Sequence, residues 1–187
     1  MPGEHNRLDA ALAAVAAHKI YGVSYAAIAE ILPRFAGVAR RFEVLLDAPG
    51  VAVVDDYAHH PTELEAAIAA ARQRFRGRRI LGVFQPHLEA RTRRHFPGFL
   101  NALALLDRVI VVQDYHVAGR DGAGGYSGAR EMAATMQALG VLDVHHASSP
   151  ADAVERAAAL RAPGDVILVM GAGDIQETGR ELARRLR

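Results

Sequence analysis

The sequence predicts an α/β protein with a mostly parallel sheet of about six strands, helices on both faces, and two preceding helices. Three observations support this fold class. Short apolar runs of β-branched residues alternate with helical stretches through most of the chain, as is typical of a parallel sheet covered on both sides. The first 36 residues show helical patterns only. The chain has 187 residues, 51% of them hydrophobic, which is enough for one substantial core with an appendage.

The N-terminal part predicts two helices with no strand between them. Residues 7–20 carry apolar side chains around most of a helix, which suits a buried helix or one packed on other helices. A second helix is expected over residues 24–32, with the serine at its start as the N-cap and Pro33 as the stop. Because two helices alone cannot easily form a core, we interpret residues 1–36 as an appendage that ends near Gly37.

Strands and helices alternate over the rest of the chain. The predicted strands are residues 42–46, 51–54, 80–84, 109–112 and 166–170, with a weaker one near 141–144. The predicted helices are residues 62–75, 91–105, 129–139, 150–160 and 175–186. Residues 119–128 are rich in glycine and predict a long loop in front of a helix.

Composition excludes several classes of function. The net charge is +1, so nothing favours nucleic acid or an anionic membrane as a partner. No run approaches the ~18 apolar residues of a spanning helix and no signal pattern is present, so we expect a cytoplasmic protein. The absence of cysteine excludes disulfides, thiolate zinc sites and cysteine nucleophiles. The single lysine, Lys19, lies in a predicted helix, so the chain has no P-loop and cannot by itself run P-loop ATP chemistry.

The densest group of chemically active side chains follows the strand predicted at residues 51–54. It comprises Asp55, Asp56, Tyr57, His59 and His60, and Pro61 then opens a helix. Ligands of parallel sheets bind beyond the carboxyl ends of the strands. The aspartates could accept hydrogen bonds from a ribose diol, hold a magnesium ion, or fix the turn, and the histidines could bind phosphate or metal or transfer protons. Adjacent histidines in an extended turn point in different directions, so a shared metal is not expected and a histidine-based metallohydrolase is the weakest hypothesis.

A second polar group follows the strand predicted at residues 80–84. Gln85 and His87 come first, and three arginines then begin the next predicted helix: Arg91, Arg93 and Arg94. Positive charge at a helix N-terminus opposes the helix dipole unless an anion is bound. This favours a carboxylate or phosphate ligand.

Two shorter segments allow a functional and a structural interpretation each. The small residues at 171–174 would let a ligand or a neighbouring loop approach the backbone closely. Asn6, just before the first predicted helix, could be its N-cap or could read an adenine edge. From the residues alone the cap is favoured.

Together these motifs resemble those of the Mur ligase family, most closely its alanine-adding branch. The matching segments occur in family order: Gly3-Glu-His-Asn6, Gly37-Val-Ala-Arg-Arg-Phe-Glu43, Asp55-Asp-Tyr-Ala-His-His-Pro-Thr62, Phe84-Gln-Pro-His87 with Arg91-Thr92, and Met170-Gly-Ala-Gly173. The resemblance implies a Rossmann-like, three-layer C-terminal domain over residues 37–187. It also implies that residues 1–36 are the helical end of the central ATPase domain. The UDP-binding N-terminal domain and the P-loop would lie outside this sequence.

The resemblance further implies an ATP- and Mg²⁺-dependent ligase of peptidoglycan synthesis. In that family the carboxylate of UDP-N-acetylmuramate is phosphorylated by ATP, and the amine of L-alanine attacks the acyl phosphate. Most Mg²⁺ ligands would lie in the absent domains, and this chain alone would be inactive. No residue here is expected to bind a metal, and no nucleic acid or membrane partner is implied.

Individual roles follow from the matched motifs. Asn6 with His5 would contact adenine, and Arg41 and Asp56 would contact the ribose region. The remaining matched side chains would lie on the muramyl and amino-acid side and would act by positioning and electrostatics: Tyr57, His59 and Arg91, with His60 and His87 nearby.

One departure keeps alternatives open. Many alanine-adding ligases have an arginine and then an aromatic residue after Gln-Pro-His, whereas this chain has Leu88 and Glu89. A related ligase that joins a recycled murein tripeptide to the same UDP-muramate therefore stays possible, although the Gln-Pro-His triplet and the later Ala118 and Gly119 favour the alanine enzyme. A second alternative is a non-catalytic module that binds a nucleotide or a partner.

Overall fold

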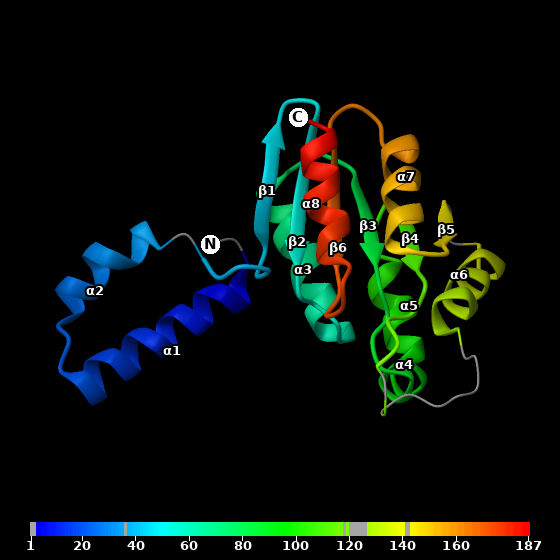
Figure 1. The fold of residues 1–187 in the computed structure, drawn as a ribbon. Coiled ribbons are helices and arrows are strands. Elements are labelled where there is room, and N and C mark those ends of the chain that lie inside the picture. Colours follow the sequence, from blue (N-terminus) through cyan, green and yellow to red (C-terminus); the bar gives the residue numbers. More distant parts are fainter. Residues whose placement is uncertain (1–2, 36, 118, 120–126, 141–142) are drawn as a thin grey trace.

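Six strands form one sheet, in the order β1-β2-β6-β3-β4-β5 (Figure 1). The computed structural model describes residues 3–35, 37–117, 119, 127–140 and 143–187. Its strands are β1 Glu43–Ala48, β2 Val51–Asp56, β3 Ile80–Phe84, β4 Arg108–Val112, β5 Val144–Ala147 and β6 Asp165–Met170. β1 runs antiparallel to β2, and all other neighbours are parallel. The predicted α/β class and mostly parallel six-stranded sheet are confirmed.

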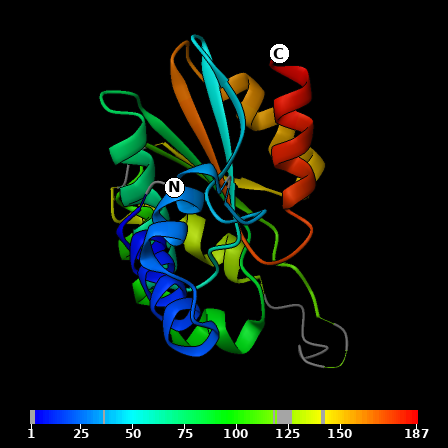
Figure 2. The same cartoon turned by 90° about the vertical axis from the view of Figure 1, so that its left-hand side faces the viewer.

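Helices cover both faces of this sheet (Figures 1 and 2). α3 Pro61–Arg74, α5 Phe96–Leu103 and α6 Gly128–Ala138 pack on one face, and α7 Pro150–Leu160 and α8 Gln176–Arg185 on the other. Every residue of β2, β3 and β6 is buried, as expected for central parallel strands covered on both sides. Because these strands are fixed from both faces, they are a rigid base for the polar segments that follow them.

The helix predicted over residues 91–105 is divided in two. It consists of α4 Glu89–Arg94 and α5, because His95 has a non-helical backbone (φ −112°, ψ 18°) ahead of Pro97. Proline is tolerated in the first turn of a helix, where its missing N–H costs no hydrogen bond. The break therefore follows from a proline at the start of the second helix.

This division corrects the argument about the helix dipole. The three arginines lie in the last turn of α4: Arg91, Arg93 and Arg94. Positive charge is favourable at a helix C-terminus, so the expectation that they begin a helix is wrong. The dipole gives no reason to expect an anion there.

The two N-terminal helices lie to one side of the sheet (Figure 1). They are α1 Glu4–Tyr21 and α2 Tyr25–Ile31, followed by the 3₁₀ turn η1 Leu32–Arg34. Ser24 caps α2 as predicted, because its hydroxyl accepts a hydrogen bond from the Ala27 N–H at 3.2 Å. Of the two alternatives for the first helix, burial is wrong, whereas packing against other helices is confirmed, because α1 contacts α2 and α3. Asn6 is the one buried residue of α1, a helix that lies entirely within the described residues, whereas Leu12 and Ile20 are 69% and 71% exposed.

We expect the isolated chain to self-associate through this apolar surface of α1 and α2, because exposed apolar patches of this kind favour association. Sedimentation velocity at rising protein concentration should show oligomers. The double variant Leu12→Glu, Ile20→Glu should stay monomeric. Leu139→Glu is the matched control, since Leu139 is also 69% exposed but lies after α6. A monomeric unaltered chain at every concentration would contradict this prediction.

In the described ranges, no helix combines the length and the apolar character that crossing a membrane requires.

Candidate functional site

The polar motifs meet at one edge of the sheet, where the parallel strands β2, β6, β3 and β4 end. Backbone bonds hold the strand ends together: the Gly171 N–H donates to the Asp56 carbonyl at 3.2 Å, and the Gln85 N–H donates to the Met170 carbonyl at 3.1 Å. The segments 55–60, 85–91 and 171–174 therefore lie side by side although they are far apart in sequence. This is the edge at which parallel α/β sheets bind ligands.

Asp56 fixes the turn after β2. Its two carboxylate oxygens accept the N–H groups of Phe42 and Ala58, both at 2.8 Å. Burial raises the pKa of Asp56, and these two hydrogen bonds and the charges of Arg41 and His5 oppose that rise. The structural interpretation as a turn aspartate is confirmed. Contact with a nucleotide stays a prediction, because a carboxylate oxygen can accept more than one hydrogen bond.

Asp55 points to the opposite face of the strand and pairs with Arg40, which the sequence analysis did not nominate. Arg40 Nε donates to Asp55 Oδ2 at 3.2 Å, and its Nη2 donates to the Gly171 carbonyl at 2.6 Å. Burial raises the pKa of Asp55, while Arg40 is the main opposing influence. This ion pair joins the segment before β1 to the ends of β2 and β6. By contrast Arg41, the arginine predicted to contact the ribose, is exposed.

Tyr57 and His59 form a small aromatic cluster beside Arg40. The Arg40 guanidinium carbon lies 4.9 Å from the centre of the Tyr57 ring, and the His59 ring meets the same ring edge-on at 5.1 Å. His59 Nδ1 lies 2.9 Å from the Tyr57 carbonyl oxygen and 3.3 Å from the Glu63 carboxylate. A ring held through Nδ1–H keeps Nε2 as its acceptor in the neutral state. The His59 ring is therefore held through Nδ1, and its Nε2 is the atom that could accept a hydrogen bond from a ligand.

His60 points elsewhere, as the sequence predicted for adjacent histidines. It is the N-cap residue of α3, and its N–H donates to the Glu63 carboxylate at 3.2 Å. Its ring meets the His95 ring at 4.6 Å between centroids. Burial lowers the pKa of His95, and so do the nearby groups His60, Arg94 and Arg91. His60 and Arg91 thus belong to one basic cluster with His95, which the sequence analysis missed.

Arg91 and Gln85 each keep a buried polar atom without a hydrogen-bond partner in the described part of the chain. These atoms are Arg91 Nη1 and Gln85 Oε1. Buried polar atoms are usually paired, so both are candidates for contact with a ligand. Gln85 Nε2 donates to Asp174 Oδ1 at 3.0 Å and so ties β3 to the segment after β6.

The small residues after β6 leave space for side chains of neighbouring segments. A Cβ on Gly173 would lie 2.6 Å from the Tyr115 ring and 2.8 Å from Gln85 Oε1. Gly171 has φ +146°, which few side chains adopt. Close approach of a neighbouring loop is therefore confirmed for this segment, and approach of a ligand stays a prediction.

Asn6 is not the cap of α1. The helix begins at Glu4 with Gly3 as its N-cap residue and no side-chain cap bond, so the favoured prediction is wrong. Instead the buried Asn6 lines a cavity of about 160 Å³ whose other walls are largely apolar: Arg7, Ala10, Leu32, Pro33 and Phe35. An amide beside apolar side chains suits a heterocyclic base.

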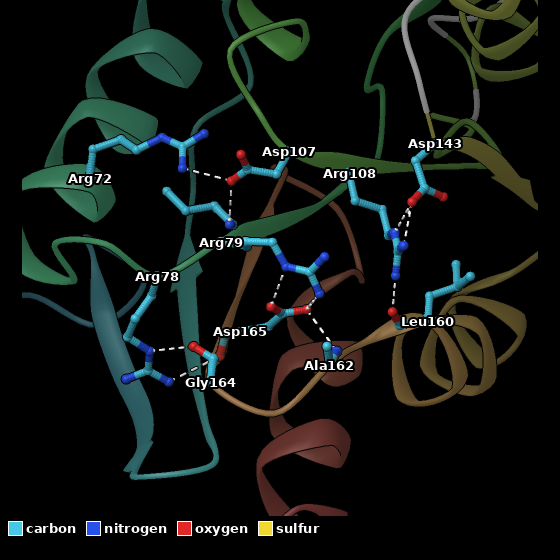
Figure 3. A network of polar contacts seen from close by, with 11 residues as sticks. Arg72, Arg78, Arg79, Asp107, Arg108, Asp143, Leu160, Ala162, Gly164 and Asp165 are labelled. Atoms are coloured by element: carbon cyan, nitrogen blue, oxygen red, sulfur yellow. Dashed lines mark hydrogen bonds and ion pairs between the residues drawn. The ribbon is translucent and has the colours of Figure 1, made fainter.

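The opposite edge of the sheet, at the amino ends of the parallel strands, differs from the candidate site because its charged side chains are paired with one another. Among its ion pairs are Arg72–Asp107, Arg79–Asp165 and Arg108–Asp143 (Figure 3). Burial alone would raise the pKa of Asp107, but hydrogen bonds from Arg72 and the Ile80 N–H hold that pKa below its ordinary value. The pKa of Asp143 is lowered likewise, by hydrogen bonds from His145 and Arg108 that outweigh burial, whereas the pKa values of Asp55 and Asp56 are raised. The amino-end edge is therefore a stabilising network, and the carboxyl-end edge is the candidate site.

Comparisons with known proteins give one consistent result. The model of the family "Mur ligase, glutamate ligase domain" matches residues 40–173. The UDP-N-acetylmuramate–L-alanine ligase of Kineococcus radiotolerans is 44% identical over 186 residues, which are 100% of this chain and 39% of that protein. The chain thus spans about two fifths of the length of this curated relative.

Solved structures agree with the sequence relatives. The UDP-N-acetylmuramate-alanine ligase of Thermotoga maritima matches with a TM-score of 0.78 and 28% identity, over 100% of this chain and 38% of that one. A murein peptide ligase from Psychrobacter arcticus matches with a TM-score of 0.70 and 27% identity, over the same shares. Ala118, on which the preference for the alanine enzyme partly rested, lies outside the described residues.

Proposed function

The chain belongs to the Mur ligase family, and from this premise we propose that it is the C-terminal part of an ATP-dependent ligase that joins L-alanine to UDP-N-acetylmuramate. The observation that carries the proposal is the clustering of the strand-end motifs at one edge of the sheet in a chain similar along its whole length to such ligases. We expect the reaction to take place in the cytoplasm, because its proposed substrates are ATP and a UDP-linked sugar.

The proposed reaction forms one amide bond for each ATP. The γ-phosphoryl group passes to the muramate carboxylate, the alanine amine attacks the resulting acyl phosphate, and phosphate leaves. Negative charge moves between carboxylate and phosphate oxygens throughout, so fixed positive groups and N–H donors can stabilise it. ATP and Mg²⁺ would supply the activation, with the phosphates held mainly by parts of the protein outside this chain.

The residues of this chain would bind and orient. Asn6, with His5 beside it, would hold adenine in the cavity next to α1. Arg41 and Asp56 would face the ribose region. The remaining groups would face the muramyl and amino-acid side: Tyr57, His59, His60, His87 and Arg91. His59 is well suited to this, because Tyr57 and Glu63 fix its ring.

We propose a domain boundary between residues 36 and 37. Residues 1–36 would be the helical end of the central ATPase domain, and residues 37–187 the whole C-terminal domain. Two features support the boundary: α1 and α2 leave their apolar side chains exposed, and the family model begins at residue 40.

A murein tripeptide ligase is the second candidate. Leu88 and Glu89 replace the arginine and aromatic residue of many alanine enzymes. Leu88 has φ +68°, in a region that side chains rarely adopt. The chain thus departs from many alanine enzymes directly after His87, which keeps the tripeptide ligase as a candidate.

A chimera tests the proposal. This chain would replace the matching segment of the Kineococcus radiotolerans ligase, and phosphate release would be followed with UDP-N-acetylmuramate, ATP and L-alanine. We expect release that needs all three substrates. No release from a folded chimera, while the parent enzyme is active, would reject the proposal and favour the non-catalytic binding module.

A further inference from the structure

Two aromatic side chains stack where β3 and β4 end. The His87 and Tyr115 rings are nearly parallel, at 9° with 5.3 Å between centroids. The same two residues form an isolated parallel bridge, and the Tyr115 N–H donates to the Pro86 carbonyl at 2.9 Å. The sheet is thereby extended by one residue pair beyond the two strands. The backbone and the rings together fix how these residues face each other.

A glycine provides the space that this stack needs. A Cβ on Gly173 would lie 2.6 Å from Cγ and from Cδ2 of the Tyr115 ring, closer than real side-chain contacts allow. The ring of Tyr115 is therefore held between the His87 imidazole on one side and the backbone after β6 on another. The Gln85 side chain fixes that backbone, because its Nε2 donates a hydrogen bond to Asp174 Oδ1 at 3.0 Å.

We propose that Tyr115 is a positioning residue that sets the plane of the His87 imidazole, with Gly173 as its seat. This inference rests on the proposed function, because His87 is one of the groups expected on the substrate side. A neutral imidazole donates or accepts only in the plane of its ring. Fixing that plane before the ligand arrives lowers the cost of orienting the hydrogen bond, and small misplacements in such sites cost up to ~100-fold in rate.

The role depends on the ring of Tyr115 and not on its hydroxyl. Tyr115→Phe should therefore keep the stack, whereas Tyr115→Leu should lose it. Gly173→Ala should push the ring away from its seat while leaving both aromatic residues in the chain. Gly50→Ala is the matched control, because the φ of Gly50 lies outside the strained range and an added Cβ would meet no atom within 4 Å.

Nuclear magnetic resonance on the full chain tests the geometry without any ligase activity. We expect contacts between the His87 and Tyr115 ring protons, and an upfield-displaced His87 Cε1–H signal, assigned with His87→Asn. The displacement should persist in Tyr115→Phe and Gly50→Ala, and should be lost in Tyr115→Leu and Gly173→Ala. Absence of ring contacts in the unaltered chain would overturn the proposal.

The same variants in the chimeric ligase test whether the orientation of the His87 ring affects ligase activity. Tyr115→Leu is expected to lower kcat/KM about tenfold or more at unchanged folded fraction, with most activity kept by Tyr115→Phe. Equal losses in the two variants would overturn the positioning role. If the unaltered chimera is inactive while the ring contacts are present, the proposed function fails and the geometry of the stack stands.

Discussion

Replacing Arg40 by methionine is expected to lower the free energy of unfolding of the chain by about 3 kcal/mol at neutral pH. The reason is the buried ion pair: the Asp55 side chain is only 4% exposed, and the variant leaves this carboxylate without its counterion. Removing one partner of a buried pair typically costs about 3–5 kcal/mol. Urea denaturation followed by circular dichroism measures the loss.

The neighbouring arginine is the matched control. Arg41 is exposed, and its guanidinium carbon lies 5.8 Å from the centre of the Tyr57 ring. Arg41→Met should therefore cost less than about 0.5 kcal/mol, as exposed substitutions usually do. Similar losses in the two variants would show that the pair does not hold the segment before β1.

The pH dependence of the Arg40→Met deficit has a definite sign. Burial raises the pKa of Asp55, and Arg40 is the main group that opposes the rise, so the pKa should rise further in the variant. A carboxyl with a higher pKa in the folded chain binds its proton more tightly when folded. Protonation therefore favours the folded variant as pH falls from 7 toward the unfolded value near 4. The deficit should be largest at pH 7 and should shrink as the solution becomes acidic.

Replacing His59 by alanine is expected to lower kcat/KM of the chimeric ligase about a hundredfold, an effect typical of a precisely held proton-transfer or binding group. The structure orients this ring by the Tyr57 carbonyl at 2.9 Å and the Glu63 carboxylate at 3.3 Å. Steady-state kinetics with saturating ATP measure the loss.

Substituting two glutamates of the same helix distinguishes the orientation of the His59 ring from general effects of surface substitutions. Glu63→Gln should lower kcat/KM only several-fold, because the Tyr57 carbonyl still holds the ring. Glu65→Gln should have no effect, since Glu65 is exposed on α3. If His59→Ala behaves like Glu65→Gln, the ring is not part of the site.

Much of the fold could be predicted because the buried strands are unambiguous. β3 and α7 have the predicted ends, and the other main strands and most helices after residue 37 differ by only one or two residues at either end. Their apolar runs are bounded by turn residues, so period and length decide the assignment. The break at His95 was missed because a proline permitted at the start of a helix is easily included inside a longer one.

The sequence predicted which segments form the site, but not which side chains contact one another there. The sequence analysis nominated Arg41 and missed the ion pair of Arg40. Arg40 has a backbone φ of +60°, and a positive φ is not expected at a residue other than glycine. The pairing of His87 with Tyr115 depends on β3 lying between β6 and β4. Strand order arises from long-range packing and is not contained in local patterns.

The most direct test of the central claim is to identify the product of the chimeric ligase by mass spectrometry, with L-alanine and the murein tripeptide present together at equal concentration. We expect UDP-N-acetylmuramoyl-L-alanine, formed only when ATP is added. Formation of the tripeptide product instead would move the chain to the recycling branch. If a folded chimera forms neither product while the parent enzyme is active, the claim that this chain is a functional ligase domain is contradicted.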